Sequence, residues 1–182
     1  MSLRHGILGL VAGRPMSGYD ITREFDLTLG HVWSARHSQI YPELSRLASE
    51  GLIEHVDSGP RGRKRYTATE AGRAEVLRWL REDEPGRDLR VEAMLQGFFY
   101  WMLEPVEAVA LIDREGAFHA AKLEAYDALA RSGIDWAATR ERHAQRIMLE
   151  AGIRYERGLV EWSEWAIGEI RRREETQGVV PS

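Results

Sequence analysis

One stretch, Ser38 to Tyr66, constrains the fold of this chain more than any other, because a helical pattern is followed at once by a hairpin pattern. Ile40, Leu44 and Leu47 fall at i, i+4 and i+7, so they share one apolar helix face. Gly51 then ends the helix at a position that glycine favours. A helix followed by a hairpin is the order of elements in a winged helix.

The hairpin consists of two strand-like runs, Leu52–Val56 and Arg63–Ala68, joined by a loop rich in turn-forming residues. Its tip carries four cations within five positions: Arg61, Arg63, Lys64 and Arg65. Such a tip can be an ordinary solvated turn. Beside a helix that can enter a major groove, however, it favours contact with DNA phosphates.

The rest of the first half completes this predicted domain. The pattern predicts a helix over residues 3–12, a second helix capped by Ser17 with Asp20 three positions later, and a fourth helix capped by Thr69. Pro42 is expected near the first turn of the third helix, because a deeper proline removes a backbone hydrogen bond. The polar segment 82–88 contains a Pro-Gly turn signal, and we expect the boundary between domains 1–84 and 89–175 there.

Five motifs occur in order over about the first 80 residues: Ile7-Leu8-Gly9-Leu10, Gly18-Tyr19-Asp20-Ile21, Ser38-Gln39-Ile40-Tyr41-Pro42-Glu43-Leu44-Ser45-Arg46-Leu47, Glu50-Gly51-Leu52-Ile53 and Arg65-Tyr66-Thr67-Ala68-Thr69-Glu70-Ala71-Gly72. As a set, they resemble the PadR-like family of bacterial transcriptional regulators. The resemblance implies a dimeric winged-helix repressor, often released from DNA by a small molecule. It carries over no particular effector, because effector-binding residues in this family vary.

The candidate DNA-binding residues lie at two helix starts, on the outer face of the third helix and on the wing. Helix starts meet phosphate through backbone N–H groups, and a tyrosine hydroxyl there adds one hydrogen bond. Tyr41 also has the alternative of a half-buried core aromatic. The candidates are Ser17, Tyr19, His37, Ser38, Gln39, Tyr41, Pro42, Arg46, Arg61, Arg63, Lys64 and Arg65.

The second half of the chain is helical in character and acidic. Residues 1–83 hold 12 Lys and Arg against 11 Asp and Glu, whereas the remainder holds 13 against 18. Helices are predicted over residues 89–102, 105–132 and 137–174. An apolar stripe follows the last of these at steps of three and four: Ile147, Ala151, Tyr155, Leu159, Trp162, Ala166 and Ile170. So long a stripe exceeds what one small chain can cover, which favours pairing with a second copy.

Aromatic residues are abundant in this helical half. Trp101, Trp136, Trp162 and Trp165 suggest either core and dimer packing or a pocket for a small aromatic effector. Both interpretations stand at this point.

Several other functions are disfavoured. The chain has no cysteine and no run of 18 apolar residues, and its start does not resemble a signal peptide, so we expect a cytoplasmic protein. The six histidines include no i, i+4 pair, and no phosphate-binding loop or nucleophile motif occurs. We therefore predict no metal, no cofactor and no enzymatic activity.

The sequence thus predicts a mainly α protein, in which an N-terminal winged helix-turn-helix with a two-stranded β-wing precedes a C-terminal α-helical dimerisation domain. The predicted function is regulation of transcription, as a repressor, by a homodimer bound to a pseudo-palindromic site on double-stranded DNA. Two alternatives remain: a winged-helix module that binds protein without specific DNA binding, and a helical ligand carrier with a vestigial DNA-binding half.

Overall fold

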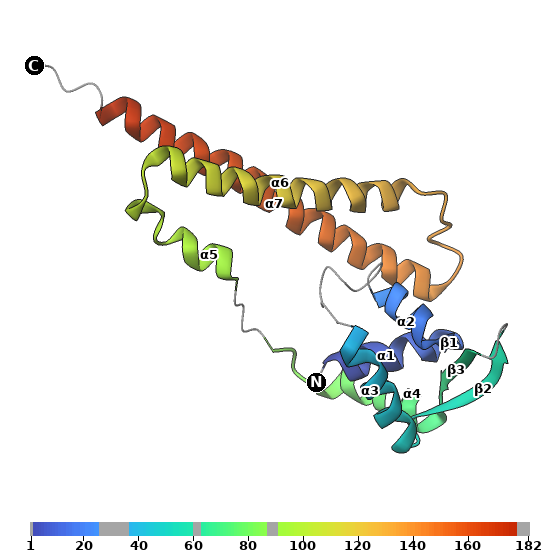
Figure 1. Cartoon of the computed structure of the whole chain (residues 1–182). Coiled ribbons are helices and arrows are strands. Elements are labelled where there is room, and N and C mark those ends of the chain that lie inside the picture. The colour runs from blue at the N-terminus through green and yellow to red at the C-terminus, as the bar shows by residue number, and fades with distance from the viewer. Residues whose placement is uncertain (1, 26–36, 60–62, 87–90, 178–182) are drawn as a thin grey trace, which may run out of the picture. The chain divides into compact units, whose positions relative to one another are not determined.

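The structure is a computed structural model that describes residues 2–25, 37–59, 63–86 and 91–177. It divides into two compact units, Met1–Gly86 and Arg87–Ser182. The first unit contains α1 (Ser2–Gly13), β1 (Met16–Ser17), α2 (Gly18–Glu24), α3 (His37–Ser49), β2 (Ile53–Gly59), β3 (Arg63–Ala68) and α4 (Glu70–Glu82). The second contains α5 (Glu92–Gly97), the short 3-10 helix η3 (Tyr100–Met102), α6 (Pro105–Arg131) and α7 (Arg140–Gln177) (Figure 1).

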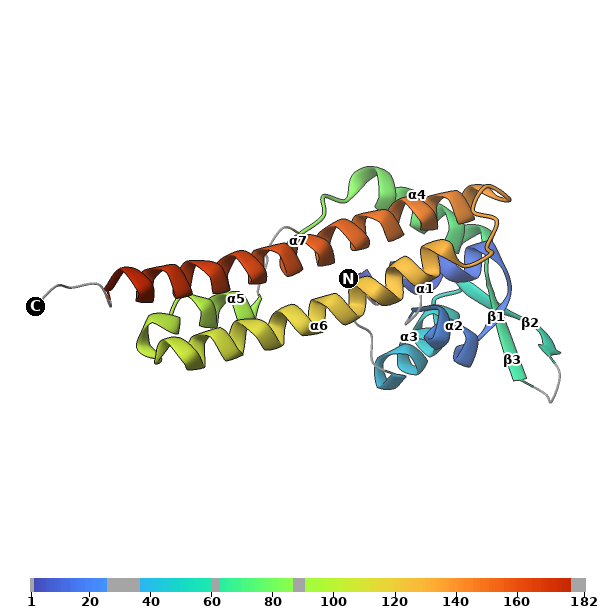
Figure 2. The same ribbon diagram turned by 90° about the horizontal axis from the view of Figure 1, so that it is seen from above.

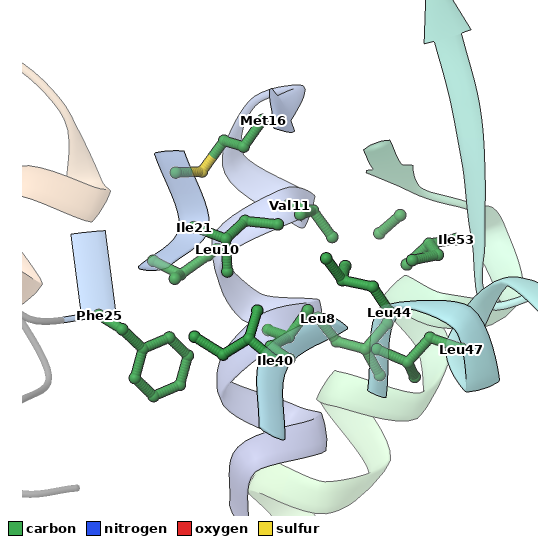
Figure 3. Close-up of a cluster of buried hydrophobic side chains, with 12 residues drawn as sticks. Leu8, Leu10, Val11, Met16, Ile21, Phe25, Ile40, Leu44, Leu47 and Ile53 are labelled. Carbon is green, nitrogen blue, oxygen red and sulfur yellow. The ribbon is translucent and has the colours of Figure 1, made fainter. Parts of the chain in front are cut away.

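The core of the first unit lies where α1, α2 and α3 meet the sheet, and its apolar side chains point toward one another (Figure 3). The predicted stripe of α3 is part of this core, since Ile40, Leu44 and Leu47 are at most 1% exposed. Burial of each such side chain stabilises the fold by about 1.5–3 kcal/mol. The opposite face of α3 is therefore held toward solvent.

The wing belongs to a three-stranded antiparallel sheet with the order β1–β3–β2. Ile53 pairs with Ala68 and Val56 with Arg65, and the register shifts between Val56 and Ser58. The prediction of β2 and β3 is confirmed. The sequence analysis did not predict β1, because two residues are too few to show an alternating pattern.

A glycine turn locks the end of α3 to the wing and to α4. Gly51 has a φ of 72°, which a residue with a Cβ rarely adopts. Its N–H donates to the Ala48 carbonyl and the Leu52 N–H to the Leu47 carbonyl, the two bonds of a Schellman motif. The Thr69 hydroxyl then donates to the Gly51 carbonyl at 2.8 Å. The Glu-Gly-Leu motif thus sets where α3 ends.

Pro42 lies deeper in α3 than the sequence analysis predicted. The helix begins at His37, which places Pro42 in its second turn. Proline lacks the N–H that would donate to the Ser38 carbonyl. Both residues are exposed, so water can satisfy that carbonyl.

The second unit is built on an antiparallel helix pair, α6 and α7, which lie side by side in both views (Figures 1 and 2). Ala108 and Ile112 of α6, with Leu149 and Ile153 of α7, are at most 5% exposed. The helices approach closely at Gly116, where a Cβ would lie 3.0 Å from the Ser163 Cβ.

A buried ionic cluster also joins α6 and α7. The Glu156 carboxylate is 1% exposed. Its oxygens lie 2.5 Å from His119 Nδ1 and 3.4 Å from Lys122 Nζ. A buried charge needs such partners, since an uncompensated one is strongly destabilising. The cluster therefore fixes the register of the two helices.

The ends of the C-terminal helices differ in part from the prediction. The single helix predicted over residues 89–102 is wrong, because α5 ends at Gly97 and a separate helical turn follows. Glycine weakens a helix interior, which accounts for the break. Pro105 begins α6 as expected. The last helix begins at Arg140 and not at residue 137, because the Thr139 hydroxyl accepts the Arg142 N–H as an N-terminal cap.

Candidate nucleic-acid interface

The outer face of α3 presents a row of exposed residues. Ser38, Gln39, Tyr41, Pro42 and Arg46 are all exposed on the side away from the core. This mixture of hydroxyl, amide and guanidinium groups can form hydrogen bonds with base edges and phosphates. The side chain of His37, which begins the helix, lies outside the described part of the structure.

Two tyrosines stand at the starts of neighbouring helices. Tyr19 of α2 is 56% exposed and Tyr41 of α3 is 53% exposed. The exposure of Tyr41 disfavours the alternative of a core aromatic. Both phenols therefore lie on the surface that a bound molecule could reach.

Ser17 has a structural function in the first unit. Its side chain accepts the Asp20 N–H at 3.2 Å, and the Ser17 N–H donates to the Asp20 carboxylate at 3.1 Å. This is the predicted cap of α2, present here as a reciprocal capping box. Ser17 is 5% exposed, so a contribution to DNA binding would come from its backbone.

On the wing, two of the four predicted cations have described side chains. Lys64 is exposed on β3. Arg65 is half-buried and donates to the Pro15 carbonyl at 2.7 Å, which ties β3 to the segment before β1. Arg61 and the side chain of Arg63 lie outside the described part of the structure. In this geometry Lys64 presents its charge outward, whereas Arg65 anchors the base of the wing.

Arg46 shares its charge with a carboxylate on its own helix. Its Nε donates to Glu50 at 3.0 Å, and Glu50 also pairs with Arg4 of α1. The hydrogen bond from Arg4, followed by that from Arg46, lowers the pKa of Glu50. Arg46 is still 67% exposed, so its free N–H groups can reach a ligand.

A second polar network joins α1 and α4, and the sequence analysis missed it. His5 is 3% exposed, stacks on Trp79 with ring centroids 4.7 Å apart, and lies 3.1 Å from the Glu75 carboxylate. Hydrogen bonds from Arg78 and then from His5 lower the pKa of Glu75 to about 2. Arg78 also binds Asp83 at 2.7 Å, where α4 ends. The pairs span up to 70 positions, and no local pattern announces them.

In the second unit, two of the four predicted tryptophans meet in one cavity. Trp162 and Trp165 line an apolar cavity of about 450 Å³ together with Phe98 and Tyr100. Trp101 is 76% exposed and is not among the lining residues. Trp136 lies between α6 and α7, and its Nε1 is buried without a partner among the described residues.

The predicted stripe of α7 is largely distinct from the face that packs on α6. Ile147 is 56% and Tyr155 is 51% exposed, whereas Leu149 and Ile153 contact α6. Ala151 is also exposed, and Leu159, Trp162, Ala166 and Ile170 are exposed or half-buried. The first half of the stripe therefore has no cover within the described part of this chain.

Among the described residues, no cluster of three or more His, Asp or Glu side chains could hold a metal ion. No described helix combines the length and the apolar character needed to cross a membrane.

Comparison with known proteins decides the family. Residues 7–78 match the model of the transcriptional regulator PadR-like family, and residues 89–171 match the model described as virulence activator alpha C-term. The negative transcriptional regulator PadR of Bacillus subtilis is 34% identical over 170 residues, which cover 89% of this chain and 93% of that protein. This chain belongs to the PadR-like family of transcriptional regulators. The prediction that it is not an enzyme is thereby confirmed.

Solved PadR-like structures share the fold of this family member over nearly its whole length. Bacillus subtilis PadR in complex with operator DNA has a TM-score of 0.81 and 32% identity, and the match covers 93% of this chain and 99% of that one. The same protein in complex with p-coumaric acid has a TM-score of 0.76 and 32% identity, with 94% and 99% covered. The predicted winged helix with a C-terminal helical region is confirmed.

Proposed function

We propose that this PadR-like regulator represses transcription by binding an operator as a homodimer, through a winged-helix domain that spans residues 1–84. The observation that carries the proposal is the exposed face of α3 beside a cationic wing, on a fold that matches operator-bound PadR. The related protein is itself named a negative regulator. Because its target is chromosomal DNA, we place this protein in the cytoplasm.

The proposed interface divides specificity from general affinity. Exposed α3 residues read base edges, since a glutamine such as Gln39 can bind adenine through two hydrogen bonds. The starts of α2 and α3, with Tyr19, contact phosphates. The wing residues hold the DNA backbone, with Lys64 as the outward charge and Arg65 as its anchor.

Two variants test this division of labour on a duplex from the region upstream of the gene. Lys64→Ala should weaken binding to every duplex and reduce the slope of log K against log salt by about 0.9, because one phosphate is no longer neutralised. Gln39→Ala should instead cost roughly 1–3 kcal/mol on the preferred sequence and little on unrelated DNA. An unchanged salt slope in the Lys64 variant would contradict the assignment of the wing.

We further propose that residues 89–175 form the dimerisation domain, through the stripe on α7. The support is the exposure of Ile147 and Tyr155, large apolar and aromatic side chains that a second copy would cover. A two-fold dimer requires an inverted repeat with half-sites about 34–36 Å apart or a multiple of that. A chain cut after Asp88 should sediment as a monomer and lose most operator affinity. A full-length protein that is monomeric at micromolar concentration would refute the dimer.

The cavity between α5, η3, α6 and α7 is the proposed effector site. Its aromatic lining suits a flat aromatic ligand, and the related PadR has been solved with p-coumaric acid. A ligand that binds the DNA-free form better must lower operator affinity. Phenolic compounds should quench tryptophan fluorescence and release the operator. Trp165→Phe should weaken both effects, whereas Trp101→Phe, outside the lining, serves as the control. Quenching that leaves operator affinity unchanged would separate the cavity from regulation.

A further inference from the structure

Gly18, the first residue of α2, lies directly against the phenol of Tyr41 on α3. A Cβ placed on Gly18 would be 2.7 Å from Tyr41 Cε1, 3.1 Å from Cζ and 3.3 Å from the hydroxyl oxygen. The outer edge and the hydroxyl of the ring therefore occupy space that any other side chain at position 18 would fill. Gly18 is buried, whereas 53% of Tyr41 is exposed.

The backbone conformation at this position does not demand glycine. Gly51 is the glycine with positive φ among the described residues, and Gly18 lies outside that region. Alanine is also more favourable than glycine in a helix. The close approach of the phenol is therefore the physical reason for a residue without a Cβ.

The backbone around Gly18 is held from several sides, so an added methyl group would displace the ring. The residue follows the capping box of Ser17 and Asp20, and its carbonyl accepts the buried Thr22 hydroxyl at 2.9 Å. The preceding Ser17 pairs with Arg65 of β3. Tyr41, in contrast, can rotate toward solvent at little cost.

We propose that Gly18 is a positioning residue for operator binding, which acts by holding the Tyr41 phenol against α2 at the surface that meets DNA. The inference rests on the proposed function. Without the cleft at Gly18, the ring would leave the position beside the start of α2, and its hydroxyl would no longer reach the same group on DNA.

A double-mutant cycle on the full-length protein tests this inference. The probe is a duplex selected from a random DNA pool by the wild-type protein. Tyr41→Ala and Gly18→Ala should each weaken binding roughly five- to tenfold, the effect of removing one hydrogen bond. In the Tyr41→Ala background, Gly18→Ala should have no further effect. Gly9→Ala, on α1 where a Cβ meets nothing within 4 Å, is the matched control and should bind like wild type.

The possible results separate this inference from the proposed function. A wild-type protein that selects no sequence would refute both. If wild type binds but Tyr41→Ala or Gly18→Ala binds equally well, only the inference fails. It also fails if Gly18→Ala weakens binding equally in both backgrounds, because the methyl group would then act through the backbone. Early thermal unfolding of Gly18→Ala that removal of Tyr41 does not correct would have the same meaning.

Discussion

Gly72→Ala adds one methyl group where the first turn of α4 meets the segment between α3 and β2. A Cβ on Gly72 would lie 3.0 Å from the Leu52 carbonyl carbon, closer still to its oxygen, and 3.3 Å from Leu8 Cδ2. The oxygen cannot rotate away, because it belongs to the backbone and accepts the Thr69 N–H at 3.0 Å. Leu8, on the other side, is completely buried.

The expected cost follows from three contributions. Overpacking of a filled interior costs about 1–3 kcal/mol. Displacing the Leu52 carbonyl weakens a hydrogen bond worth about 1 kcal/mol. Alanine regains up to about 1 kcal/mol over glycine in a helix. We therefore expect Gly72→Ala to lower the free energy of unfolding by about 2 kcal/mol, which corresponds to a decrease in Tm on the order of 10 °C for a domain of this size.

Urea denaturation followed by circular dichroism would measure this destabilisation, and hydrogen exchange would locate it at residues 52–72. Gly9→Ala is the matched control, because its Cβ meets open space on an exposed helix position. It should be neutral or slightly stabilising. Equal stability of the two variants would show that the junction yields without cost, and the explanation of the Thr-x-x-Gly motif by close packing would be wrong.

Other predictions concern the helix pair and the charged networks. Gly116→Ala should cost about 1–2 kcal/mol in urea denaturation because its methyl group meets Ser163, whereas Gly158→Ala, with open space, should not destabilise. Glu156→Ala should cost about 3 kcal/mol by leaving two cationic partners without their carboxylate; unchanged unfolding would contradict this. Because the pKa of Glu75 is lowered from 4.5 to about 2, its stabilisation is complete above about pH 4.5 and is lost as pH falls toward 2. Glu75→Gln should cost about 1 kcal/mol after solvent screening, measured at pH 7, and nothing near pH 2.

The winged helix could be predicted from the sequence because its elements are imposed by local rules. Burial of one helix face produced the spacing of Ile40, Leu44 and Leu47, and the cap of α2 required a hydroxyl three residues before a carboxylate. These patterns act within a few turns of one helix. They therefore survive in the sequence as readable periods and motifs.

Contacts between distant segments could not be predicted in the same way. Arg65 could be recognised as a wing cation, but its bond to the Pro15 carbonyl joins positions 50 residues apart. The contact of Gly18 with Tyr41 likewise depends on how α2 packs against α3. In the second unit, equal-looking tryptophans separate because α5 ends at Gly97, which brings Phe98 and Tyr100 to Trp162 and leaves Trp101 outside.

The central claim is sequence-specific DNA binding by a dimer, and selection from a random duplex pool with the full-length protein tests it most directly. We expect enrichment of an inverted repeat whose half-site centres lie one helical turn apart, about 10 base pairs, or a multiple of it. Binding to the selected duplex should decrease steeply with salt, as counterion release requires. A pool that shows no enriched sequence after repeated rounds, or binding of equal strength to selected and unselected duplexes, would contradict the claim.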